Sequence, residues 1–86
     1  MGKINATVLG MEEGLRNFTG VDMIRIKSGD YTILIMEDYM PVIGRVDGSV
    51  EIVEGEKVSA FPSIHGFYTH RKNMFELLIK EDSDAE

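Results

Sequence analysis

Apolar and polar residues alternate along several short segments of the chain. Ile24 and Ile26 alternate with Arg25 and Lys27, and residues 49–53 repeat this pattern. A period of two places alternate side chains on the same face of a β-strand. An amphipathic helix would instead need apolar residues three and four positions apart over about ten residues or more, and no segment has that spacing. The pattern therefore predicts short strands.

Glycine and proline divide the chain between these segments. Asp47-Gly48 has the composition of a hairpin turn, and Pro41 and Pro62 belong at a strand start or edge because proline lacks an N–H donor. The expected strands are residues 4–9, 22–27, 31–36, 40–43, 49–53, 57–61, 64–69 and 74–79. Together they predict an all-β fold, a small two-sheet β-sandwich of about eight to ten short strands.

The same spacing predicts which side chains form the core. Those expected between the two sheets are Ile24, Ile26, Ile33, Ile35, Val50, Ile52, Phe67, Leu77 and Ile79. Residues 31–36 form an uninterrupted apolar run, which predicts a strand buried on both faces or nearly so. Among the methionines, Met36 and Met74 are expected to fill gaps in the core, whereas Met40 lies beside Pro41 in a turn and is the better interface candidate.

Length and charge limit the domain organisation and the partners. The 86 residues suffice for one domain, residues 1–80, and the net charge is −6. Residues 81–86 hold four acidic residues and no base, so they predict a disordered acidic tail and leave the domain at a charge of −2. A nearly neutral body without a basic face argues against nucleic acid as the partner. Without a long apolar run or a polybasic patch, direct membrane insertion is not expected.

The sequence contains no recognisable catalytic, cofactor-binding or metal-binding motif. Cysteine is absent, which excludes disulfides, thiolate catalysis and Cys-ligated metals. His65 and His70 are five residues apart, so on one strand they would lie on opposite faces and could not share a metal. Glu12-Glu13 and Glu37-Asp38 are carboxylate pairs expected at turns. A general acid needs burial or a like-charge neighbour to raise its pKa, whereas adjacent carboxylates at turns are usually solvated. We therefore predict a protein that is not an enzyme, with no cofactor and no small-molecule substrate.

The order of strands and turns resembles the N-terminal β-sandwich domain of the epsilon subunit of F-type ATP synthase. The Phe-Ser-Gly-like step of that family corresponds to Phe18-Thr19-Gly20, and its His-Ala-Pro loop corresponds to Tyr39-Met40-Pro41. Its Gly-Gly-Phe strand corresponds to His65-Gly66-Phe67, and its closing Asn-x-Val-Thr-Val-Leu strand to residues 73–79. The resemblance covers residues 3–80 and implies a sandwich-only member that lacks the inhibitory C-terminal helical domain.

This resemblance implies a non-catalytic rotor or central-stalk module. Such a module would dock on the gamma subunit and the membrane c-ring and would help couple proton transport to ATP synthesis. The expected partner interface is Tyr39, Met40, Pro41 and Val42, which match the His-Ala-Pro loop and form a short apolar cluster at a turn. The module is expected in the cytoplasm, where a protein complex would hold it at the periphery of the membrane.

Other interpretations remain open. A divergent stand-alone sandwich could serve as a protein-interaction adaptor with no role in ATP synthase, because a fold does not determine a function. The four loop residues could equally be ordinary packing at the edge of the sandwich. A small-molecule binder would need a pocket with converging polar groups, which the sequence does not indicate.

Overall fold

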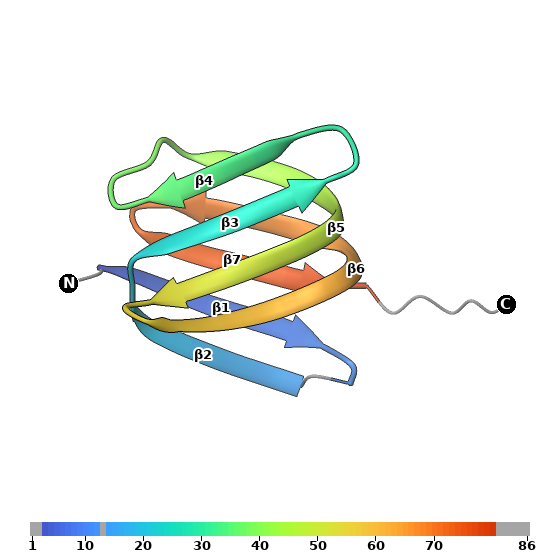
Figure 1. Cartoon of the computed structure of the whole chain (residues 1–86), viewed down its shortest axis with the longest axis horizontal. Coiled ribbons are helices and arrows are strands. Elements are labelled where there is room, and N and C mark those ends of the chain that lie inside the picture. The colour runs from blue at the N-terminus through green and yellow to red at the C-terminus, as the bar shows by residue number, and fades with distance from the viewer. Residues whose placement is uncertain (1–2, 13, 81–86) are drawn as a thin grey trace, which may run out of the picture.

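The computed structural model describes residues 3–12 and 14–80, and these ranges form seven β-strands and no helix (Figure 1). The strands are β1 (Ile4–Gly10), β2 (Gly14–Val21), β3 (Met23–Ser28), β4 (Thr32–Met36), β5 (Val42–Glu54), β6 (Lys57–Arg71) and β7 (Met74–Ile79). The prediction of an all-β fold is confirmed. The expected acidic tail, residues 81–86, lies outside the described residues. Nowhere in the described ranges does a helix have the length and apolar character needed to cross a membrane.

The strands form one mixed sheet in the order β2-β1-β7-β6-β5-β3-β4. Neighbouring strands are antiparallel except for β1 and β7, which run parallel. The long strands β5 and β6 belong to both layers of the fold. In one layer, the second half of β6 pairs with β7 and with the first half of β5. In the other layer, the second half of β5 pairs with β3. Figure 1 shows β5 and β6 turning together from one layer into the other, so the sheet folds over on itself.

A β-bulge lies at this bend. Gly48 pairs with Ile64 and Val50 pairs with Phe61, so Ser49 faces two residues of β6, Pro62 and Ser63. Ser63 has a positive φ of 56°. An extra residue on one strand bends the pair and increases its twist, which accounts for the change of layer at this point.

The hairpin predicted at Asp47-Gly48 and the strand end predicted at Pro62 are therefore wrong. Both positions lie inside continuous strands of 13 and 15 residues, so two pairs of expected strands each merge into one strand. With β2, which was not expected, the described ranges contain seven strands. Pro62 is tolerated because the bulge already interrupts the ladder of hydrogen bonds. Gly48 is required for close packing rather than for a turn, since a Cβ there would lie 2.1 Å from the carbonyl oxygen of Lys27.

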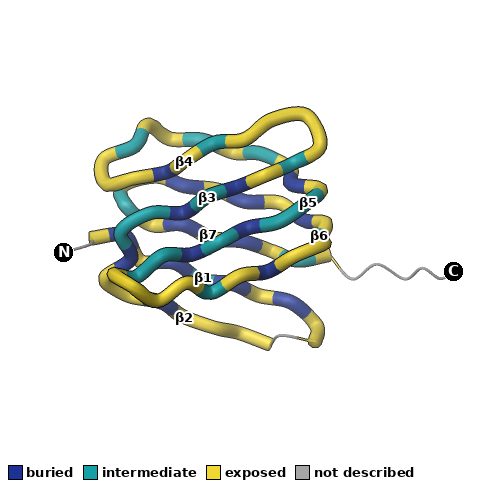
Figure 2. Tube along the Cα trace, viewed as in Figure 1, coloured by how far each residue is buried: buried dark blue, intermediate teal, exposed yellow. Residues whose placement is uncertain are grey.

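The core lies between the two layers, where buried and exposed positions alternate along the strands (Figure 2). The predicted core residues that are buried are Ile24, Ile26, Ile35, Val50, Ile52 and Leu77, with Ile33 and Ile79 partly buried at its margin. Phe67 contradicts the prediction: it is 46% exposed, because β6 turns its neighbour Tyr68 inward instead. Residues 31–36 are likewise not buried on both faces, because β4 is the edge strand and Ile35 alone among them is fully buried.

Candidate protein interface

The loop between β4 and β5 carries the four residues predicted to form an interface. It lies at the same end of the molecule as the β6–β7 turn and the start of β1 (Figure 1). At its beginning, the Tyr39 N–H donates a hydrogen bond of 3.0 Å to the carbonyl oxygen of Met36. Asp38 has a φ of 64°, in the left-handed region that Asp and Asn enter more readily than most residues. The chain thus reverses tightly before it reaches Met40.

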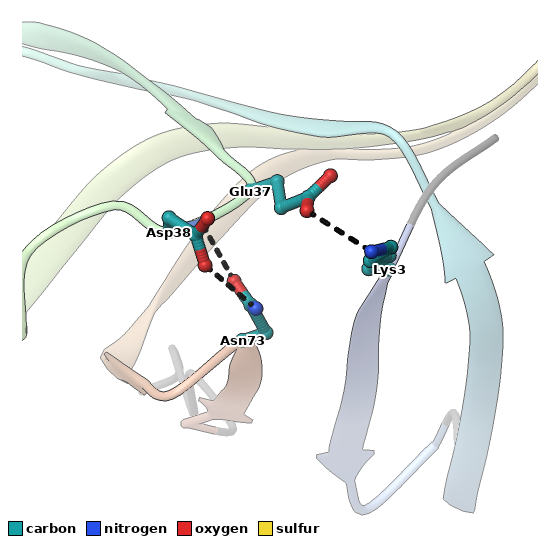
Figure 3. A network of polar contacts seen from close by, with 4 residues as sticks. All are labelled: Lys3, Glu37, Asp38 and Asn73. Carbon is teal, nitrogen blue, oxygen red and sulfur yellow. Dashed lines mark hydrogen bonds and ion pairs between the residues drawn. The ribbon is translucent and has the colours of Figure 1, made fainter.

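Asp38 connects this loop to the β6–β7 turn (Figure 3). The Asp38 N–H donates to Oδ1 of Asn73 at 2.7 Å, and Nδ2 of Asn73 donates back to Oδ1 of Asp38 at 3.2 Å. The Asn73 carbonyl oxygen in turn accepts a hydrogen bond of 2.9 Å from the Asn5 N–H on β1. An exposed ion pair adds a further contact, with Nζ of Lys3 3.7 Å from Oε2 of Glu37. These contacts fix the path of the loop against two other segments of the chain.

The four predicted interface residues divide into two pairs. Tyr39 and Val42 are partly buried and pack against the core. Met40 is 68% exposed, and Pro41 beside it is also exposed. Tyr39 and Val42 therefore position the loop, whereas Met40 and Pro41 are the side chains that a partner can contact.

Two more exposed methionines lie near this loop, and the prediction that both fill gaps in the core is wrong. Met36 ends β4 and Met74 begins β7, and both are exposed. Like Met40, each lies within two residues of the Asp38–Asn73 link. Flexible, polarisable methionine side chains suit a surface that adapts to a partner. We call Met36, Met40 and Met74 the methionine end of the molecule.

His70 lies against the inner side of this loop. Its side chain is 1% exposed, and its ring contacts those of Tyr39 and Phe75 at centroid distances of 6.4 and 6.3 Å. Neither ring nitrogen has a hydrogen-bond partner in the described part of the chain. Burial disfavours the charged imidazolium and lowers the pKa of His70. The loop is thus supported by a buried histidine that is held in its neutral form.

His65 lies on the opposite, exposed side of β6, as its odd spacing from His70 predicted. Its Nδ1 is 3.0 Å from Oδ1 of Asp47. Within residues 3–12 and 14–80, His, Asp and Glu form no group of three or more that could hold a metal ion.

A shallow groove runs between the β3–β4 turn and strands β5 and β6. Tyr31 covers part of it, donating a hydrogen bond from its hydroxyl to the Arg45 carbonyl oxygen and lying 3.1 Å from the hydroxyl of Tyr68. Burial, together with this contact, raises the pKa of Tyr68, so its hydroxyl stays protonated. The charged residues that line the groove, Asp30, Arg45, Asp47 and Lys80, are exposed and of both signs. A small-molecule site would instead bring buried polar groups together.

Comparison with known proteins shows that the fold is shared with a solved structure. No protein-family model matches the sequence, and no curated protein sequence matches it. The structure is similar to a chain in the cryo-EM structure of the Tetrahymena thermophila mitochondrial ATP synthase central stalk and c-ring. The TM-score is 0.74 at 18% sequence identity, and the match covers 94% of this chain and 67% of that chain. This chain therefore has the fold of a component of an ATP synthase stalk and c-ring assembly.

Proposed function

We propose that this chain is a non-catalytic module of the central stalk of an ATP synthase, comparable to the epsilon subunit. The observation that carries the proposal is the structural similarity to a chain of the stalk and c-ring assembly, which extends over 94% of the residues. In this role the module binds the gamma subunit and the c-ring and helps couple proton transport to ATP synthesis. It performs no chemistry of its own and is held at the cytoplasmic periphery of the membrane by the complex.

The methionine end supplies the contact surface in this proposal. Met40 and Pro41 are exposed, and the Asp38–Asn73 hydrogen bonds hold their loop in place. A loop that is ordered before binding loses less conformational entropy when the partner arrives. Burial of one large apolar side chain contributes about 1.5–3 kcal/mol, so a few methionines can supply much of a modest affinity.

A capture experiment with purified gamma subunit and c-ring tests this function. The wild-type chain should bind, and Met40→Asp should abolish binding because it places an unpaired charge in an apolar contact. That change costs several kcal/mol, whereas micromolar affinity corresponds to only about 8 kcal/mol. Met40 is the better site than Tyr39 for this test, because Tyr39 packs on the core and its replacement by Asp would also destabilise the fold.

The matched control is Met11→Asp. Met11 is 82% exposed in the turn between β1 and β2, at the opposite end of the molecule from the β4–β5 loop (Figure 1), so this variant adds the same charge away from the methionine end. It should bind like the wild type. If the wild-type chain captures neither subunit while the enzyme of the same organism assembles with another epsilon chain, the proposal is wrong and the stand-alone adaptor replaces it.

A further inference from the structure

A continuous row of exposed apolar side chains crosses the outer face of one layer. In the register of the sheet, Leu15 of β2 pairs with Leu9 of β1, and Leu9 pairs with Leu78 of β7. Leu78 pairs in turn with Phe67 of β6. Paired residues of adjacent strands share a face and lie side by side. These four side chains, which we call the leucine row, are between 46% and 62% exposed.

Mainly polar residues border the leucine row on both sides. One margin is the neighbouring row of the register, formed by Asn17, Thr7, Glu76 and Thr69, and on β5 this row ends at the exposed Ile43. The other margin is formed by Asp47, His65 and Lys80. Within the first margin, the Thr7 hydroxyl donates a hydrogen bond of 3.1 Å to Oδ1 of Asn17. An apolar centre surrounded by a polar rim is the arrangement found in protein–protein interfaces.

The two ends of the leucine row carry opposite charges. Arg45 of β5 pairs with Phe67 and continues the row at one end. Glu12 lies near the other end, in the turn that connects β1 and β2, three residues beyond Leu9. Neither the Arg45 side chain nor that of Glu12 forms an ion pair with any residue in the described ranges. A second copy that meets this face with its row reversed would bring each Arg45 close to the Glu12 of the other copy.

We propose that the leucine row is the contact surface of a two-fold symmetric dimer of the free chain. The two-fold axis lies in the interface and runs parallel to the strands, so the leucine rows oppose each other in reverse order. The contact is isologous, and the Arg45–Glu12 pairing occurs twice. A two-fold axis along the row would instead place Arg45 against Arg45, and like charges disfavour that arrangement.

The size and the position of the surface define what kind of dimer to expect. Four partly exposed side chains per copy form a small apolar centre, so the dimer should dissociate reversibly in the micromolar range rather than be permanent. The β1–β2 turn, where the row has its acidic end, lies at the opposite end of the molecule from the β4–β5 loop (Figure 1). The dimer therefore does not depend on the function proposed for the methionine end.

Sedimentation velocity of the full chain, from micromolar to millimolar concentration, tests the dimer. The wild type should show a monomer–dimer equilibrium, and Leu9→Glu should weaken the dimer by about a hundredfold or more, because two carboxylates enter its apolar centre. Val58→Glu places the same charge at a comparably exposed apolar site in the other layer and should leave the equilibrium unchanged. Circular dichroism verifies that each variant is folded, and Leu78→Lys takes the place of Leu9→Glu if that variant is not.

A charge exchange tests the predicted orientation. Arg45→Glu and Glu12→Arg should each weaken the dimer by about tenfold, and the double variant should regain wild-type affinity. A wild-type chain that stays monomeric throughout, or a dimer that is insensitive to Leu9→Glu, would overturn the proposal. A double variant without recovery would overturn the orientation. If the chain is monomeric and Leu9→Glu instead prevents its binding to gamma subunit, the row serves a different partner and the homodimer is wrong.

Discussion

Asp38 and Asn73 are 35 residues apart in the sequence and are joined by two reciprocal hydrogen bonds. Both residues also have a positive φ, 64° for Asp38 and 60° for Asn73. Asp and Asn tolerate this backbone region better than other residues with a Cβ, and their side chains make the link. Residue type therefore determines both the local turn and its attachment to the neighbouring turn.

Asn73→Ala should lower the free energy of unfolding by about 1–3 kcal/mol, because it removes the hydrogen bonds and leaves a Cβ in the left-handed region without compensation. Asn73→Gly removes the same hydrogen bonds, but glycine adopts a positive φ without strain, so the loss of unfolding free energy should be smaller. Urea unfolding of the two variants measures the difference. Wild-type stability in Asn73→Ala would show that the link contributes nothing to the fold.

The stability of the protein should depend on pH through His70. Its pKa in the folded state lies below the ordinary value of 6.5 because burial disfavours the charged ring. As pH falls below that ordinary value, the unfolded chain binds a proton that the folded chain does not, so the free energy of unfolding decreases. Above it the ring is neutral in both states, and this contribution is constant.

Urea unfolding between pH about 7.5 and about 5.5 measures this dependence. His70→Phe should remove the part of the slope that His70 causes, while the carboxylates contribute equally to both proteins. An unchanged slope in His70→Phe would mean that His70 is hydrated and titrates normally in the folded protein.

Gly44→Ala should destabilise the protein by about 1–3 kcal/mol through overpacking. A Cβ at Gly44 would lie 2.4 Å from the Tyr68 hydroxyl oxygen, and Tyr68 is buried and hydrogen-bonded to Tyr31. Gly29→Ala is the control, since a Cβ there would meet no atom within 4 Å. Thermal unfolding should separate the two variants clearly, and equal melting temperatures would contradict the close approach.

Ile35→Ala should cost about 2–4 kcal/mol because the deleted atoms leave a cavity in the core. Ile35 is fully buried on β4 and pairs with Ile24, which is also fully buried. Leu34→Ala, one position away on the exposed face of the same strand, should cost less than about 1 kcal/mol. Chemical unfolding measures the stability of the two variants and so reports which face of β4 is buried. If Leu34→Ala cost more than Ile35→Ala, the opposite face of the strand would be the one in the core.

The alternation of residues predicted the inward faces of β3, β7 and the second half of β5 because each has one side in the core and one in solvent. It did not predict β2, which is an edge strand in which only Phe18 and Val21 are buried. Nor did it predict that β5 and β6 continue through Gly48 and Pro62. There the long-range pairing of two strands overrides the local preference for a turn, and the bulge accommodates the proline.

The candidate sites were predictable only in part. The loop at residues 39–42 could be placed from Pro41 and the apolar cluster, and its role as an interface stays a prediction. That Tyr39 packs inward while Met40 faces outward depends on His70 and the core behind the loop. The Asp38–Asn73 link and the leucine row have no local signal, because they arise from the register between segments far apart in the sequence.

The parallel pairing of β1 with β7 has a consequence for how the protein is made. β7 lies between β1 and β6, so without it the sheet consists of two separate parts, β2-β1 and β6-β5-β3-β4. β7 is also the last of these strands to leave the ribosome. Pairings this distant in sequence form slowly, and strand edges that wait for a partner can associate with other chains. The nascent domain should therefore need a chaperone most between the emergence of β6 and the emergence of β7.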